Sequence, residues 1–561
     1  MAYSTKLETT AELREIAEHN QLGMLICAPA GCGKTEALAF RVEQILNRYN
    51  FGNSGRKILI LTFTNNARDN IGDRLLHYLS PATIRERVTL CNFHGLAARI
   101  IASHGHQIQL DSSWQIANYD WLSQELSRRA YSRDAKKRIT EELHNAKLAN
   151  ISDDEVWDAL QKRDTEDARI ALDIEECRTE NKVITFDDQI RVALWILRNE
   201  KVLSLYRNHF FAAIVDEFQD LTPQQLCFVT LLCQNNVTYA GDISQGIYSF
   251  AGARGNAALE HIRSQGITEF SLTSSFRSSP AILRAINSLQ PLTNGSSFHC
   301  AFPEHWEGGG LFGSIGFNNH QHEAQWISSI AQAVYRHCPH HRIGIISRTN
   351  YRMNYIRRAL SNNHISYYDW GDGLFSPSVA KVLRNICQDR SISNRDDPLT
   401  YMRTLSFEMG ANDTEELDFG LSWLCDHLFQ SEATEVLRRI KTKVSGETVT
   451  SAPGIHCLTG HAGKGQQFDW VFIPGLEEGC IPDYRAKTKD EISEEAKILS
   501  VMLSRARIGA VVSYSSAPSN GYPTRSSRFL SHLKHVEGIR TGSDDIISWF
   551  QNADWNALAS M

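Results

Sequence analysis

Short apolar runs recur along the first half of the chain, and each gives way to a stretch with helical periodicity. The runs lie at residues 25–28, 58–63 and 88–91, and they return at 211–215, 237–241 and 270–272. Apolar runs of this length that alternate with helices are typical of parallel strands buried on both faces. The pattern therefore predicts an α/β domain with a parallel sheet.

A charged, helical stretch interrupts this pattern between residues 106 and 182, with helical segments at 134–148 and 153–173. Because strand patterns resume after it, the stretch is predicted to be an insertion into one sheet domain.

A second α/β region follows the glycine-rich, aromatic stretch 291–317. Its predicted strands are 343–347, 365–368, 455–459, 470–474 and 510–514, with a polar helical block at 385–450. The predicted fold class is α/β, with two parallel-sheet domains that each carry a helical insertion. The predicted boundaries are 1–104 and 184–275 for the first sheet domain, 105–183 for its insert, 276–384 and 451–561 for the second sheet domain, and 385–450 for its insert.

The composition of the chain limits which kinds of partner and cellular compartment we expect. The formal net charge of -6 excludes a globally basic nucleic-acid coat, so any nucleic-acid contact must be a local groove. The twelve cysteines are scattered and form no Cys-x-x-Cys pair, which suits a reducing cytosol. Without an apolar leader or a run of about 18 apolar residues, we expect a cytoplasmic protein with no membrane partner.

The best-defined chemical segment is Ala28-Pro29-Ala30-Gly31-Cys32-Gly33-Lys34-Thr35, which lies between an apolar run and a helical pattern. In such a loop backbone N–H groups surround a polyphosphate, Lys34 neutralises its β and γ oxygens, and the Thr35 hydroxyl ligates Mg²⁺. A side chain at Gly33 is expected to strike the phosphate. A flexible glycine turn with a surface lysine is the alternative. The predicted nucleotide-binding residues are Ala30, Gly31, Gly33, Lys34, Thr35 and Glu36.

Two carboxylates follow the buried run at 211–215. Asp216 is predicted to hold Mg²⁺, and Glu217 to orient or deprotonate the attacking water. A solvated acidic turn is the alternative, but the Gly-Lys-Thr loop upstream favours hydrolysis of ATP with Mg²⁺.

Further segments stand in one order along residues 24–530. They are 61–67, 92–97, 185–188, 241–250, 272–278, 347–350, 459–465, and 494–495 with 504–507. This ordered set resembles the superfamily 1 helicases of the UvrD, Rep and PcrA group. The resemblance implies two RecA-like domains, ATP and Mg²⁺ as cofactors, and 3′ to 5′ movement along single-stranded or tailed duplex DNA.

Charge and amide groups around the γ-phosphate complete the predicted motor. Gln245 follows a strand end, where its amide can bind the γ-phosphate or the attacking water. Arg277 and Arg505 are expected to face the phosphate from opposite sides of a cleft, so that ATP bridges the sheet domains and hydrolysis releases them. A solvated helix charge is the alternative for Arg505. The predicted catalytic residues are Lys34, Asp216, Glu217, Gln245, Arg277 and Arg505, and Gly465 is predicted to contact the nucleotide.

Contacts with DNA are predicted from short polar groups, which hold phosphates, and from aromatic rings, which stack on bases. For the aromatic rings the alternative is core packing, and for the histidines a helix start or a core position. The predicted DNA-binding residues are Thr64, Asn65, Phe93, His94, Tyr248, Phe250, Arg348, Thr459 and His461.

The chain departs from the helicase pattern at several positions. Residues 13–15 offer no glutamine to read adenine, so selectivity for ATP over GTP is open. Ser275 replaces an asparagine, Ala251 replaces a basic residue, and Gln467 replaces a glutamate that would supply an anionic acceptor. These changes predict a motor with weakened ATP turnover.

The second insert, 385–450, is short. Such short forms resemble the UvrD-like subunit of the Gabija anti-phage defence system, which works beside a nuclease. Since the chain shows no nuclease motif, a nuclease partner is predicted, with Trp423 and Leu424 at its docking surface. A regulatory ATPase subunit that senses nucleotide and DNA, an RNA helicase, and a role in repair remain alternatives. Cys338, His340 and His341 lack a second ligand pair, which disfavours zinc.

Overall fold

The computed structural model describes residues 10–49, 51–52, 54–117, 121–129, 131–249, 252–370, 373–375, 377–389, 392, 398–409, 415–428, 433–442, 452–461, 463–516 and 523–561. By its internal contacts the chain divides into two units. Unit 1 comprises Met1–Arg277 and Asn294–Ala301, and unit 2 comprises Ser278–Thr293 and Phe302–Met561.

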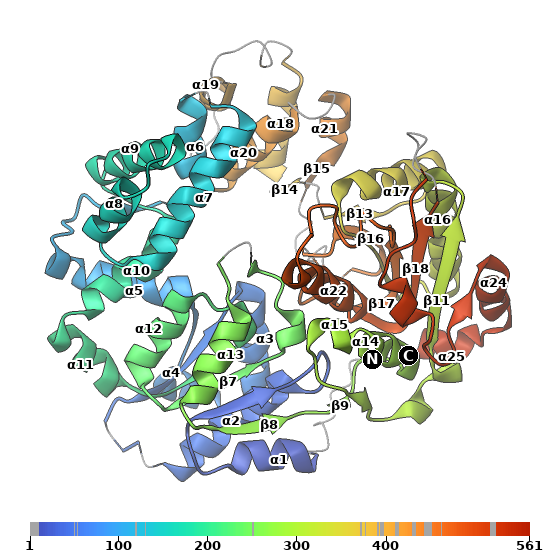
Figure 1. Cartoon of the computed structure of the whole chain (residues 1–561), viewed down its shortest axis with the longest axis horizontal. Coiled ribbons are helices and arrows are strands. Elements are labelled where there is room, and N and C mark those ends of the chain that lie inside the picture. The colour runs from blue at the N-terminus through green and yellow to red at the C-terminus, as the bar shows by residue number, and fades with distance from the viewer. Residues whose placement is uncertain are drawn as a thin grey trace. The chain divides into compact units, whose positions relative to one another are not determined.

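Unit 1 is built on a parallel sheet (Figure 1). Its strand order is β3 (Val88–Asn92), β2 (Lys57–Thr62), β6 (Phe210–Asp216), β7 (Val237–Gly241), β1 (Met24–Cys27) and β8 (Thr268–Ser271). The register pairs Cys27 with Gly241, and Asp216 with Ala240. The carboxyl ends of β1, β6 and β7 therefore meet at one edge of the sheet, where α/β proteins bind their ligands.

Helices cover both faces of this sheet, because alternate side chains of its strands point to opposite sides. On one face, β1, β2, β6 and β7 share a core with α5 (Phe93–His104), α10 (Phe186–Leu197), α11 (Glu200–His209), α12 (Pro223–Cys233) and α13 (Gly255–Ser264). The other helices of the sheet domain are α1 (Ala11–Glu18), α2 (Lys34–Arg48), α3 (Asn65–Leu75) and α4 (Pro81–Arg87). A short parallel pair, β9 (Ser274–Ser275) with β10 (His299–Cys300), accounts for the return of residues 294–301 to unit 1.

The helical insert of unit 1 has a core of its own. It contains α6 (Trp121–Arg128), α7 (Arg133–Ala149), α8 (Asp153–Gln161), α9 (Glu166–Glu180) and the strand pair β4 (Gln115–Ile116) with β5 (Val183–Ile184). A cluster of charged side chains, here called the charge cluster and buried except for the partly exposed Asp153, joins the insert to α10. Its members are Lys147, Asp153, Glu175, Arg178, Asp188 and Arg191. Lys147 on α7 contacts both Glu175 on α9 and Asp188 on α10 at 2.9 Å.

Unit 2 contains a second parallel sheet. Its order is β13 (Tyr368–Asp369), β16 (Gly454–Thr459), β12 (Arg342–Ser347), β17 (Phe468–Pro474), β18 (Ala506–Ser515), β11 (Leu311–Phe317) and β19 (Arg540–Thr541). One face forms a core with α16 (His320–His337), α17 (Asn350–Asn362), α24 (Ser543–Asn552) and α25 (Trp555–Ser560). The remaining helices outside the insert are α14 (Pro280–Ser288), α15 (Gln290–Thr293), α22 (Lys489–Leu503) and α23 (Leu530–Leu533).

The second insert has a small apolar core formed by α18 (Pro377–Cys387), α19 (Pro398–Glu408), α20 (Glu415–Leu428) and α21 (Ala433–Arg439). The parallel strands β14 (Gly373–Phe375) and β15 (Ile440–Thr442) pair with each other beside these helices. The structure thus has the predicted α/β class, with two parallel-sheet domains that each carry a helical insertion.

Some sequence-based expectations for single elements were wrong. Residues 365–368 were predicted as a strand, but only Tyr368 is in one, because Ile365 N–H donates to the Leu360 carbonyl at 2.9 Å and ends α17. Strand β11 lies within the stretch interpreted as a glycine-rich connection. The predicted helix 153–173 is broken, and α9 begins anew at Glu166, after the N-cap Thr165, whose hydroxyl accepts a hydrogen bond from Ala168 N–H at 3.2 Å.

Candidate active site

The phosphate-type loop joins the end of β1 to the start of α2. Gly31 and Gly33 both have a φ of 81°, in the left-handed region that favours glycine. Gly31 also allows a close approach, because a Cβ there would lie 2.4 Å from the Cβ of Arg277. At Gly33 a Cβ would meet Leu13 no nearer than 3.8 Å, so within the protein the backbone conformation is what requires glycine. A clash with phosphate at Gly33 stays a prediction.

The residues around the loop are held by contacts within unit 1. The Ala30 carbonyl accepts a hydrogen bond from the Ser275 hydroxyl at 3.3 Å. Thr35 lies in the first turn of α2, next to Lys34. Glu36 is buried, accepts a hydrogen bond from Tyr78, and pairs with Arg74 at 3.0 Å. The Glu36 carboxylate is therefore occupied by side chains of unit 1, and its contact with a nucleotide stays a prediction.

Lys34 brings the loop together with the two carboxylates at the end of β6. Its Nζ lies 3.1 Å from Asp216 Oδ1 and forms an ion pair with Glu217. Burial lowers the pKa of Lys34, but the charges of Asp216 and Glu217 more than offset this, so the pKa lies above its ordinary value. Lys34 is therefore a protonated, largely buried cation at the carboxyl edge of the sheet.

Glu217 adopts a backbone conformation that is uncommon for a residue with a side chain. Its φ of 60° and ψ of 49° lie in the left-handed region. Its N–H donates to Asp216 Oδ1 at 3.1 Å, and Gln219 Nε2 donates to its Oε2 at 2.5 Å. Such strain persists where surrounding contacts enforce it, and it is concentrated at functional sites.

The turn after β7 is organised by one carboxylate. Asp242 Oδ1 accepts hydrogen bonds from the Ser244 N–H at 2.9 Å and the Ser244 hydroxyl at 2.6 Å. Its Oδ2 accepts a hydrogen bond from Gln245 Nε2 at 2.8 Å. Gln245 is buried and is held by the turn in which it lies.

The donor set at this edge suits Mg²⁺. Asp216 and Thr35 offer carboxylate and hydroxyl oxygens, the hard ligands that this ion prefers. Proteins usually bind Mg²⁺ through one or two carboxylates together with substrate phosphates. Among the described residues, no group of three or more His, Cys, Asp or Glu side chains has the geometry of a metal site. This finding is compatible with a Mg²⁺ site that uses one carboxylate and substrate phosphates.

The two predicted arginines lie in different units. Arg277 is the last residue of the first segment of unit 1 and lies beside Gly31; burial lowers its pKa, an effect that Cys32 and Glu217 oppose. Arg505 in unit 2 is 2% exposed, and its guanidinium donates to the Val501 carbonyl at 2.9 Å. Gly465, also in unit 2, has a φ of 84°. Their roles toward a phosphate stay predictions.

The predicted strand-binding residues of unit 1 differ in accessibility. Thr64 is exposed and accepts a hydrogen bond from Ala67 N–H at 3.1 Å, which caps α3. Tyr248 stacks on Phe63, with ring centroids 5.2 Å apart. Phe93, in contrast, is 1% exposed within the apolar core, so the structure does not support it as a base-stacking residue. Phe250 and the side chain of Asn65 lie outside the described residues.

Phe186 is an aromatic residue that the sequence reasoning missed. It is 62% exposed at the start of α10, and its ring stacks on His94 with centroids 3.7 Å apart. Burial lowers the pKa of His94 to about 4, so the stack is uncharged at neutral pH. The available signal was a large aromatic residue directly after Thr185, within a segment already singled out and at a helix start that is usually polar.

Unit 2 contains the remaining predicted contacts. Thr459 ends β16, and His461 follows in the next turn. Arg348 is paired with Glu495 of α22, with Arg348 Nη2 and Glu495 Oε1 2.8 Å apart. Leu424 is buried in the core of the second insert and Trp423 packs against that core, so the structure does not support these two residues as a docking surface.

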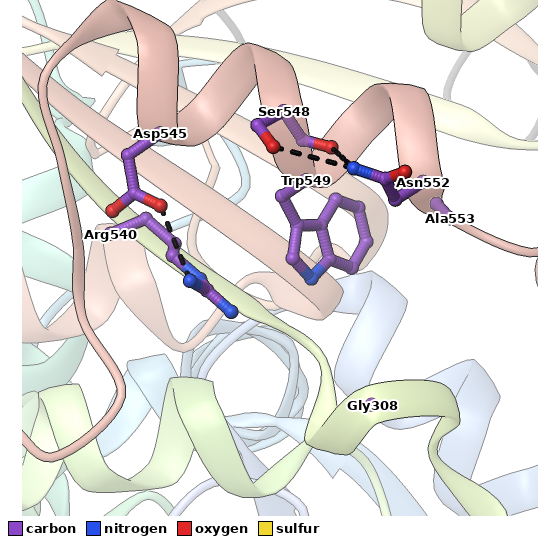
Figure 2. A pocket seen from close by; sticks show the side chains of 7 residues that line it. All are labelled: Gly308, Arg540, Asp545, Ser548, Trp549, Asn552 and Ala553. Carbon is purple, nitrogen blue, oxygen red and sulfur yellow. Dashed lines mark hydrogen bonds and ion pairs between the residues drawn. The ribbon is translucent and has the colours of Figure 1, made fainter.

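Each unit contains a pocket formed by described residues. Figure 2 shows one in unit 2, of about 240 Å³, where Trp549 lies among Arg540, Asp545, Ser548, Asn552, Ala553 and Gly308. The other, of about 200 Å³ in unit 1, touches the phosphate-type loop at Ala28 and Pro29 and the turn at Asp242 and Ile243. The unit 1 pocket thus adjoins the predicted site. Among the described residues, no helix is both long and apolar enough to span a membrane.

Comparisons with known proteins agree with this geometry. The UvrD/REP helicase N-terminal domain matches residues 9–264, and the UvrD-like helicase C-terminal domain matches residues 270–438 and 427–517. The chain belongs to the UvrD-like helicases. It is accordingly an enzyme of the ATP-hydrolysing helicase class.

Individual relatives are similar at low identity along most of the chain. The ATP-dependent DNA helicase UvrD2 of Mycobacterium tuberculosis is 24% identical over 559 residues, covering 91% of this chain and 79% of the relative. The ATP-dependent DNA helicase Rep of Escherichia coli is 24% identical over 596 residues, covering 86% and 87%. The ATP-dependent DNA helicase PcrA of Leuconostoc citreum is 26% identical over 475 residues, covering 81% and 62%.

Proposed function

We propose that this UvrD-like helicase is an ATP-dependent DNA helicase that moves 3′ to 5′ along a single strand. The observation that carries the proposal is the meeting of Lys34 with Asp216 and Glu217 at the carboxyl edge of the first sheet. A lysine from a glycine loop beside paired carboxylates is the arrangement that phosphoanhydride hydrolysis needs.

Each group has a distinct task in this proposal. Lys34 neutralises charge on the β and γ phosphates, and Glu217 orients the attacking water and accepts its proton. Thr35 and Asp216 hold Mg²⁺, which when bound neutralises charge on the phosphates. Gln245 responds to the γ-phosphate. Arg277 and Arg505 stabilise the charge that develops on the γ-phosphate.

Strand binding is proposed at the aromatic pairs of unit 1, supported by the stacking in both pairs and by the exposure of Phe186. Phe186 on His94 and Tyr248 on Phe63 offer ring faces to unpaired bases of any sequence. Thr64 in unit 1, and Arg348, Thr459 and His461 in unit 2, are also proposed to contact the strand.

The rate of phosphate release from nucleotide tests the proposed ATP-driven motor. ATP and GTP are each supplied without nucleic acid, then with single-stranded DNA, single-stranded RNA or duplex DNA. We expect turnover that single-stranded DNA stimulates and that the Glu217→Gln variant lacks. Turnover indifferent to every nucleic acid would refute the proposal, and preferential stimulation by RNA would favour an RNA helicase.

The proposal also covers the direction of unwinding and the protein partner. We propose unwinding of duplexes with a 3′ tail but not a 5′ tail, and a role in anti-phage defence or DNA repair beside a nuclease partner. The short second insert supports the defence role through its resemblance to the Gabija subunit. Efficient unwinding by the purified chain alone would count against a required partner. Turnover of ATP with no unwinding would favour the regulatory subunit, which the neutral Gln467 also favours.

A further inference from the structure

Gln219 lies next to the proposed active-site carboxylates but has no role in the proposal above. It belongs to the 3₁₀ turn Phe218–Asp220 that follows Glu217, and it is 1% exposed. Its side-chain amide makes one hydrogen bond with each of its two ends. Nε2 donates to Glu217 Oε2 at 2.5 Å, and Oε1 accepts from the backbone N–H of Asp242 at 3.0 Å. A single amide thus joins the Glu217 carboxylate to the start of the turn after β7.

The side-chain amide of Gln219 packs closely against Gly241, and its backbone packs closely against Gly255. A Cβ on Gly241 would lie 2.1 Å from Gln219 Oε1, and a Cβ on Gly255 would lie 2.8 Å from the Gln219 carbonyl oxygen. Close-packed groups transmit small displacements to their neighbours. A shift of the backbone at Gly241 and Asp242 must therefore move the Gln219 amide and, with it, the hydrogen bond to Glu217.

The turn that Gln219 contacts leads to a proposed strand-binding residue. Asp242 holds Gln245 through a 2.8 Å hydrogen bond, and Tyr248 follows three residues later, stacked on Phe63. The Tyr248 carbonyl also accepts the N–H of Ala253 at 3.3 Å. The backbone of residues 245–248 therefore links the aromatic stack to the turn, and the two hydrogen bonds of Gln219 link the turn to Glu217.

We infer that Gln219 is a positioning residue that sets the orientation of the Glu217 carboxylate according to the position of the 242–245 turn, and so transmits strand binding to hydrolysis. The inference rests on the proposed function. It assigns Gln219 no contact with nucleotide, water or nucleic acid. Its effect passes through one hydrogen bond on each side.

Two substitutions test the two side-chain hydrogen bonds of Gln219. Gln219→Glu keeps an oxygen acceptor for Asp242 N–H but loses the donor to Glu217, whereas Gln219→Leu loses both. Gln224→Leu is the matched control, because Gln224 is also buried but donates to the carbonyls of Lys147 at 2.7 Å and Asn150 at 3.0 Å, away from Glu217. Thermal midpoints identify any variant that fails to fold.

The readouts are kcat and KM for ATP, with and without saturating oligo-dT. A misplaced reacting group can cost about 100-fold in rate, so we expect a loss of this order in the DNA-stimulated kcat of both Gln219 variants. The KM for ATP and the affinity for oligo-dT should change by less than about twofold, since binding contacts are untouched. The ratio of stimulated to basal kcat should fall toward one, while Gln224→Leu should keep the wild-type ratio.

Different failures point to different parts of the reasoning. Folded Gln219 variants that keep the wild-type stimulation would overturn the inference and leave the proposed function intact. An equal loss of basal and stimulated kcat would overturn the transmission of strand binding. A wild-type protein that no nucleic acid stimulates would overturn the proposed function, and the inference with it.

Discussion

Replacing Lys34 by methionine should destabilise unit 1 in addition to abolishing hydrolysis. Lys34 and Asp216 lie 3.1 Å apart with side chains 13% and 6% exposed, and Glu217 adds a second negative charge. At an effective dielectric constant of about 20, two charges at this separation attract by ~5 kcal/mol. Removing one partner of a buried pair typically costs about 3–5 kcal/mol, because the remaining charge stays desolvated. We expect a loss in this range for Lys34→Met without nucleotide.

Hydrogen exchange measures this loss where it arises. Amides of β1 and β6 should exchange faster in Lys34→Met, by an amount matching a reduction of about 3–5 kcal/mol in the free energy of opening. The double variant Lys34→Met/Asp216→Asn removes a carboxylate as well and should regain at least half of that loss. A single variant within about 1 kcal/mol of wild type, the size of an exposed pair, would refute the reasoning. If the loss occurs, Glu217→Gln is the cleaner control for ATP turnover.

Three further outcomes follow from the structure. Glu217→Gln should lower kcat by about 10²–10⁴-fold, the usual contribution of a general base, while ATP still raises the thermal midpoint. Phe186→Ala should weaken oligo-dT binding by about 1–3 kcal/mol in fluorescence anisotropy, whereas Leu205→Ala, at a side chain 60% exposed on α11, should not. Burial lowers the pKa of His456 from 6.5 to about 4, so the unfolded chain binds a proton first as pH falls. This residue should therefore cost unit 2 up to about 3 kcal/mol between pH 6.5 and 4, and the pH dependence in urea titrations should be weaker in His456→Gln.

The strands that the sequence predicted best are those at the centre of the sheets. β6 and β7 are buried on both faces, so most of their residues are apolar and the strands stand out in the sequence. β11 is just as regular, but it was not predicted as a strand because Gly313 and Gly316 interrupt its apolar residues. A Cβ at Gly313 would lie 2.9 Å from Ile546, and one at Gly316 would lie 2.8 Å from Tyr514. The glycines there make room for neighbouring side chains, which no local pattern reveals.

Some residues of the candidate site could likewise be predicted from the sequence, and others could not. The loop with Lys34 and the carboxylates Asp216 and Glu217 could be predicted, because their chemistry depends on short segments at strand ends. The accessibility of aromatic residues could not, since it depends on packing between distant segments. Phe93 points into the core that α5 shares with the sheet, whereas Phe186, at the start of α10, has its ring exposed to solvent. The contact of Gln219 with Asp242 likewise requires β6 and β7 to be neighbours.

The charge cluster has a consequence for how unit 1 folds. Lys147 on α7 is shared by Glu175 of the insert and Asp188 of the sheet domain, and all three side chains are at most 3% exposed. If α7 opened alone, it would leave a surplus of buried negative charge, which costs several kcal/mol. Partial opening is therefore penalised. The insert and the sheet domain should unfold as one cooperative unit, although the insert occupies a separate stretch of the chain and has a core of its own.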